Sequence, residues 1–211
     1  MRIMHVMGGG DVGGAKTQIM NTVTGLNRNN DVMLISFRAG PFADEARERG
    51  IDVRVIERHN PFRAARTMRD LVDEFKPDII HCHGWMTALA PLYIKKVYKD
   101  EPSFRDAKVI FSLYEDDFKQ PFHADFSNKL LLKGIAKKDI AGLKEPIDYT
   151  ALCKLAADFS DGIIQQSEHV NEEVLNYARE SGKPVLEYQS PENFAEACND
   201  FYDKVWETEQ K

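Results

Sequence analysis

Short runs of β-branched residues alternate along this chain with longer stretches whose apolar residues recur every three or four positions. The alternation is typical of a parallel sheet covered by helices on both faces, because each parallel crossover needs a long connection, usually a helix. We predict strands at residues 3–7, 32–37, 53–57, 78–83, 108–114, 162–167 and 185–188. The predicted fold class is therefore α/β, with a single doubly wound, mostly parallel sheet of about seven strands.

Amphipathic stripes predict helices between these strands, each with one apolar face to pack on the sheet. Pro61 and Pro191 follow capping residues and predict helix starts, while Gly182 and Pro184 predict the end of a helix before the last strand. Residues 115–148 have mixed charge around a run of leucines, and we expect helices there too. The stripes are Ile19, Val23 and Leu26; Ala65, Met68, Val72 and Phe75; Leu152, Leu155, Ala156 and Phe159; Phe194, Ala197, Phe201 and Val205.

Composition narrows the class of protein. The 211 residues suffice for one domain, expected over residues 1–211, and the 43% apolar and 29% charged residues are typical of a folded globular chain. A net charge of −6, with no basic run, argues against a nucleic-acid partner. Three cysteines without CxxC spacing predict neither a disulfide framework nor a zinc ribbon, and thus a reducing compartment. Without a signal peptide or a membrane-length apolar stretch, we expect a cytoplasmic protein with no membrane span.

A glycine-rich segment, residues 8–17, follows the first predicted strand and opens the first predicted helix. Gly13 and Gly14 would let backbone N–H groups approach an anion, with Lys16 beside them. Gly8, Gly10 and Gly13 satisfy the GxGxxG spacing of dinucleotide sites, but the second predicted strand ends in Arg38 rather than an acid. A phosphate loop fails by one residue, and a strand-to-helix turn without a ligand stays an open alternative.

His83 is the leading single candidate, because ligands of open α/β sheets sit beyond the carboxyl ends of the strands. Alternation places His81 and His83 on one face of the fourth strand and Cys82 on the other. Two histidines without an assured third ligand do not predict a metal, so none is expected. The fifth strand is followed by three acids, residues 115–117, which could bind a cation or act as a base but more often form a solvated turn.

With these residues in view, the chain resembles the acceptor-side, N-terminal domain of nucleotide-sugar-dependent glycosyltransferases of the GT-B fold. Residues 1–77 resemble the general retaining branch through residues 3–6, the Gly13–Gly14 turn, Gln18 and residues 76–81. From about residue 77 onward the chain more closely resembles short bacterial glycogen (starch) synthase-like proteins, through residues 81–93 and 107–114. The change of branch suggests a recombined or engineered chain with a junction near residues 77–84.

The resemblance implies a retaining transfer from a nucleotide sugar such as ADP-glucose or UDP-glucose to a glucan or other sugar acceptor. The leaving diphosphate would meet Gly13, Gly14 and Lys16, and His83 would hydrogen-bond the reacting sugar. The acceptor-side cleft would hold three further residues, and no cofactor is implied beyond the substrate. Those cleft residues are Trp85, Tyr114 and Glu115.

Three departures from the family pattern weaken the expected chemistry. The Lys-Thr before the paired glycines is replaced by Asp11-Val12, a histidine after the tryptophan by Met86, and a His-Asn pair by Tyr114-Glu115. The resemblance covers the acceptor-side domain and not the donor-binding domain, so we expect no efficient catalysis by this chain alone. The alternatives are a glucosyltransferase completed by a partner or a homodimer, a nucleotide- or anion-binding module, and a scaffold without a ligand.

Overall fold

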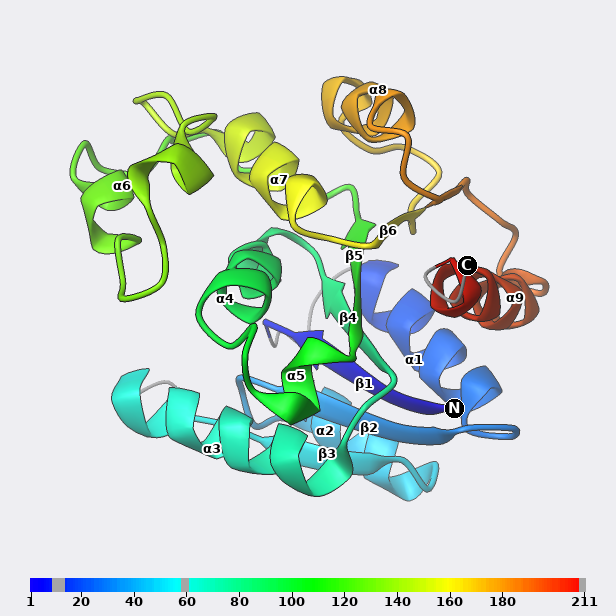
Figure 1. Cartoon of the computed structure of the whole chain (residues 1–211). Helices are drawn as coiled ribbons and strands as arrows, with labels where there is room; N and C mark the ends of the chain where they lie inside the picture. Colours follow the sequence, from blue (N-terminus) through cyan, green and yellow to red (C-terminus); the bar gives the residue numbers. More distant parts are fainter. Residues whose placement is uncertain (9–13, 58–60, 209–211) are drawn as a thin grey trace.

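Seven parallel strands form one open sheet in the computed structural model, which describes residues 1–8, 14–57 and 61–208 (Figure 1). The strand order is β3-β2-β1-β4-β5-β6-β7, and every neighbouring pair is parallel. This confirms the predicted doubly wound sheet, with each strand within one or two residues of its expected bounds. The strands are β1 Arg2–Met7, β2 Asp31–Ser36, β3 Asp52–Val55, β4 Ile79–His83, β5 Lys108–Leu113, β6 Gly162–Gln165 and β7 Val185–Leu186.

Helices cover both faces of this sheet (Figure 1). One apolar core joins the sheet to α3, α4, α5, α7 and α8, and the other joins it to α1, α2 and α9. The helices are α1 Gly14–Leu26, α2 Pro41–Glu48, α3 Pro61–Phe75, α4 Ala90–Lys96, α5 Pro102–Arg105, α6 Phe126–Lys129, α7 Tyr149–Asp158, α8 Glu172–Glu180 and α9 Phe194–Glu207. Two 3-10 turns, η1 Trp85–Thr87 and η2 Lys137–Ile140, complete the described elements.

The two faces of the sheet follow from strand alternation. In β4, Ile80 and Cys82 point to the core under α3 and α4, while Ile79 points to the core under α1 and α9. Every residue of β4 and β5 is buried, as expected for central strands with helices on both sides. The histidines of β4 therefore share the face on which α1 and α9 lie side by side (Figure 1).

One predicted boundary was wrong, and one segment expected to be helical contains only short helical turns. The last helix begins at Phe194 rather than at Pro191, because residues 190–193 form a turn closed by the Asn193 N–H and the Ser190 carbonyl, 3.1 Å apart. Between β5 and α7 the described chain has only two single turns, α6 and η2. That segment is held by separate apolar side chains inserted into the core, rather than by the stripe of a helix: Leu130, Ile135, Ile140, Leu143 and Ile147.

None of the helices in the described residues is long and apolar enough to cross a bilayer.

Candidate functional site

The strand order places a topological switch point between β1 and β4. The chain winds outward through β2 and β3 on one side of β1 and returns to β4 on the other side. In doubly wound sheets, ligands bind in the crevice outside the carboxyl ends of the strands at such a point. Met7 lies opposite His83 in the register, so Gly8 and the Gly84–Trp85 turn leave the sheet side by side. We call this region the carboxyl-edge site: Gly8, His83, Gly84, Trp85, Tyr114 and Asp116.

His83 lies at the end of β4, as predicted, but it is buried, with 4% of its surface exposed. Its Nε2 is 2.8 Å from Nδ1 of His5, and its Nδ1 is 2.7 Å from the hydroxyl of Tyr114. Burial lowers the pKa of His5 to about 3 and holds the pKa of His83 well below its usual value, so both imidazoles are neutral near pH 7. A direct bond from His83 to a sugar would therefore require one of these two partners to give way.

His81 extends the network to α9. Its Nδ1 is 2.7 Å from the hydroxyl of Tyr202, and its Nε2 is 2.5 Å from Oγ of Ser112 on β5. The rings of His81 and His83 stack with centroids 3.9 Å apart. Burial also lowers the pKa of His81 well below its usual value, with the neighbouring histidines adding to the effect. A neutral, hydrogen-bonded layer thus lies directly beneath the carboxyl edge.

The three histidines offer ligand atoms that all lie within 4.8 Å of one another. However, each of their ring nitrogens except Nε2 of His5 already has a hydrogen-bond partner. Stacked rings also direct their in-plane lone pairs side by side, not toward one point. The geometry favours a hydrogen-bond network, and the absence of a metal stays a prediction.

Trp85 begins η1, where its half-buried indole packs edge-on against Phe118 and Phe122, with centroids 5.0 and 6.4 Å apart. Tyr114 is buried, whereas Glu115, the acid singled out from the sequence, is exposed. The neighbouring Asp116 turns inward and contacts the Gly84–Trp85 turn. The structure therefore brings Trp85 and Tyr114 to the carboxyl edge as predicted, with an aromatic group beside them.

Of the predicted phosphate-binding residues, Gly13 lies outside the described residues and Gly14 is the first residue of α1. Lys16 points toward α2, with its Nζ 3.5 Å from a carboxylate oxygen of Glu45 and 5.8 Å from the ring centroid of Phe42. The first turn of α1 contains no acidic residue, which leaves its N–H groups suited to an anion. Because Lys16 pairs with Glu45, an anion at the start of α1 would be bound by backbone N–H groups, and this anion site stays a prediction.

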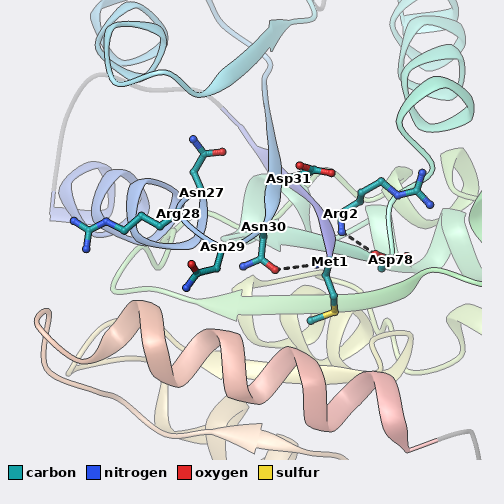
Figure 2. A pocket seen from close by; sticks show the side chains of 8 residues that line it. All are labelled: Met1, Arg2, Asn27, Arg28, Asn29, Asn30, Asp31 and Asp78. Carbon is teal, nitrogen blue, oxygen red and sulfur yellow. Dashed lines mark hydrogen bonds between the residues drawn. The ribbon is translucent and has the colours of Figure 1, made fainter.

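Two hollows lie away from the carboxyl edge. A polar hollow of about 730 Å³ lies at the amino ends of β1, β2 and β4, where the Met1 amine donates to Oδ1 of Asn30 at 3.0 Å (Figure 2). An almost wholly apolar cavity of about 490 Å³ separates α3 from α4. Neither touches the histidine network. The polar hollow is lined by Met1, Arg2, Asn27, Arg28, Asn29, Asn30, Asp31 and Asp78.

Sequence reasoning missed the partners of the predicted residues. His5 is 78 positions from His83 and Tyr202 is 121 positions from His81. A histidine inside a buried strand, on the alternation face of the β4 histidines, was the one available signal for His5. For Tyr202 and Asp116 the sequence carries no such signal, because only packing shows which of many similar residues faces inward.

Comparison with known proteins gives a family. The family described as "starch synthase catalytic domain" matches residues 38–187. The glycogen synthase of Desulfitobacterium hafniense is 30% identical over 115 residues, covering 54% of this chain and 22% of that protein. The glycogen synthase of Pelodictyon phaeoclathratiforme is 52% identical over 40 residues, covering 19% of this chain and 8% of that protein. The matched segments thus span less than a quarter of the length of these relatives.

Solved structures share the fold. The catalytic domain of starch synthase IV from Arabidopsis thaliana, bound to ADP and acarbose, has a TM-score of 0.61 at 14% identity, covering 92% of this chain and 52% of that one. Anabaena Alr3699/HepE in complex with UDP has a TM-score of 0.53 at 14% identity, covering 95% and 50%. The family match crosses residues 77–84, and a recombination there stays a prediction.

Proposed function

Because this chain belongs to the starch synthase catalytic domain family, we propose that it is the acceptor-side domain of a glycogen or starch synthase-like glucosyltransferase. In this proposal the carboxyl-edge site binds an α-glucan. Transfer from a nucleotide sugar then needs a donor-binding domain in addition to residues 1–211. The observation that carries the proposal is the convergence of the half-buried Trp85, the Asp116 carboxylate and the imidazole network at the switch point of the sheet.

The aromatic group supports glucan binding. A sugar ring presents an apolar C–H face that can stack on an indole, and its hydroxyls need hydrogen-bond partners around that face. Trp85 supplies the ring, and Phe118 and Phe122 hold it in place. The exposed Glu115 and the partly buried Asp116 supply carboxylate acceptors after β5. An apolar platform rimmed by acceptors is the arrangement that a linear glucan requires.

The donor side is supported by α1 and by the relatives. Starch synthase IV binds ADP and HepE binds UDP, and both are about twice the length that this chain covers. We infer that the start of α1, at Gly14, faces the diphosphate of ADP-glucose or UDP-glucose. Lys16 is engaged by Glu45, so the cations for that diphosphate would come from the donor-binding domain. Turnover by this chain alone is therefore expected to be absent.

Single-tryptophan variants test glucan binding. The chain has two tryptophans, Trp85 at the carboxyl edge and Trp206 on α9. In Trp206→Phe, maltoheptaose should change the emission of Trp85 in a saturable way. In the matched Trp85→Phe variant, the emission of Trp206 should not respond, and cellohexaose should affect neither. Saturable binding that survives in Trp85→Ala would place the glucan elsewhere and refute this part of the proposal.

A transfer assay tests the division of labour. Purified chain is incubated with glycogen and radiolabelled ADP-glucose or UDP-glucose, and label in the polymer is measured with and without a separately expressed donor-binding domain of a related glycogen synthase. Label should enter glycogen only in the mixture. Transfer by the chain alone would contradict the need for a second domain. Absence of glucan binding in the fluorescence assay, together with absence of transfer in the mixture, would overturn the proposed function itself.

A further inference from the structure

Asp116 links three elements of the carboxyl edge through one carboxylate. It lies three residues beyond the end of β5, between the starts of η1 and α7. Its Oδ1 accepts a hydrogen bond from the hydroxyl of Tyr149 at 2.9 Å, and its Oδ2 accepts a longer one from the backbone N–H of Trp85 at 3.4 Å. The tyrosine is 3% exposed and is the first residue of α7. The carboxylate therefore links the backbone of Trp85 to a buried side chain at the start of α7.

Gly84 shows how closely this carboxylate fits the turn. Its φ of +70° lies in the left-handed region that side-chain-bearing residues rarely adopt. A Cβ at this position would come within 2.6 Å of Oδ2 of Asp116. The carboxylate thus occupies the space beside the turn that a side chain would otherwise need. The turn that aims Trp85 and the position of Asp116 depend on each other.

We propose that Asp116 is the positioning residue of Trp85: its ionised carboxylate holds the Gly84–Trp85 turn, and protonation of that carboxylate loosens the turn and frees the indole. An ionised acceptor makes stronger hydrogen bonds than a neutral one, so protonation weakens both links to the turn and to Tyr149. The indole itself contacts only Phe118 and Phe122 among the described rings within stacking distance. Gly84 keeps its backbone bonds to Ser112 and Thr87, so the opening is local to the Trp85 N–H and makes the indole more accessible to water.

Among the groups that face Asp116, the carboxyl of Asp116 is the one expected to change its protonation near neutral pH. Burial, with the nearby charge of Asp117, raises the pKa of Asp116 to about 6, although the bonds from Tyr149 and Trp85 act in the opposite direction. Burial also raises the pKa values of Tyr149, of Tyr114 and of the Cys153 thiol, so these three stay neutral over the same range. Asp117 is exposed and accepts a hydrogen bond from the neutral amide of Asn171 at 2.9 Å.

This inference rests on the proposed function only in naming a sugar as the ligand of Trp85. The positioning role itself can be tested without a sugar. In the Trp206→Phe background, the emission and acrylamide quenching of Trp85 are followed as the pH is lowered from about 8 to about 5.5, with circular dichroism at each step. A transition centred near pH 6 is expected, with quenching rising about twofold as the turn opens locally.

Two further variants in the same background decide the origin of that transition. Asp116→Asn keeps the shape of the side chain but cannot titrate, so the transition should disappear. Asp117→Asn, the matched control, should keep the transition and move its midpoint to lower pH, because a repelling charge is removed. A transition that persists in Asp116→Asn, or that is missing from folded Trp206→Phe, overturns the positioning role. If the emission of Trp85 shows the expected pH transition but maltoheptaose does not bind at any pH, the positioning role stands and the proposed function fails.

Discussion

Acidification below pH 6.5 is expected to destabilise this chain steeply through its three buried histidines. His5, His81 and His83 are fully or almost fully buried, and burial lowers the pKa of each imidazole, to about 3 for His5. In the unfolded chain each returns to its ordinary value of 6.5. The unfolded state therefore binds more protons than the folded state, and the free energy of unfolding falls as the pH falls.

The size of the effect follows from proton linkage. At pH 5 each histidine that stays neutral in the fold contributes a loss of about 2 kcal/mol, or about 6 kcal/mol for all three. Asp116 acts in the opposite direction: its pKa is raised to about 6 in the fold, so its contribution is complete at low pH and is lost as the pH rises through about 6. Between pH 7.5 and 5 it offsets about 1 kcal/mol, which leaves a net loss of about 5 kcal/mol. Because a domain is stable by only about 5–15 kcal/mol, the chain should be close to unfolding at pH 5.

Urea unfolding at several pH values between 7.5 and 5 measures this loss as the change in the free energy of unfolding. The expected slope is about two net protons, or about 2.7 kcal/mol per pH unit, below pH 6. His5→Gln should lower the slope by about one proton, and Asp116→Asn should raise it by about one. The control His123→Gln makes the same replacement at an exposed histidine and provides the reference slope. A slope below one net proton, or equal slopes for His5→Gln and His123→Gln, would refute the reasoning.

Three further predictions concern packing and chemistry away from the site. Gly25→Ala should lower the free energy of unfolding by about 1–3 kcal/mol in thermal denaturation, because its Cβ would lie 2.4 Å from the Cβ of Ala195 on α9. Gly142→Ala, with open space around it, should have little effect. Lys183→Met should cost about 1–3 kcal/mol in urea unfolding, because the Lys183 ammonium donates to three carbonyl oxygens in the folded chain. Thiol titration at pH 8 should detect no reactive cysteine in the native protein and three in denaturant, because burial raises the pKa of each thiol. Labelling of Cys82, Cys153 or Cys198 in the native protein would contradict this.

Much of the architecture could be predicted because it depends on patterns of apolar and polar residues over short stretches of the chain. A strand buried on both faces needs a continuous apolar run, and β1, β2, β4 and β5 show such runs with one or two polar exceptions. The exceptions proved informative. His81 and His83 share a face as alternation predicts, and both belong to the polar network. The segment between β5 and α7 could not be predicted in this way, because it packs through isolated side chains without a repeating period.

The candidate site was predictable only in part. Strand ends can be read from the sequence, so His83, Trp85 and Tyr114 could be assigned to the carboxyl edge before any coordinates. Their roles depend on partners that are distant along the chain, as in the bond between His83 and His5. Glu115 is exposed and Asp116 is partly buried. The sequence does not show this difference, because the two residues are adjacent and carry the same charge.

The sequence by itself determined the order of strands and helices, the two-sided burial of the sheet and the residues that end each central strand, because these depend on hydrophobic periods over a few residues. Only the tertiary structure decided which imidazoles hydrogen-bond, which carboxylate turns inward and where Lys16 points. These depend on the register of non-adjacent strands and on the docking of α2, α7 and α9, which bring together side chains that no local pattern relates.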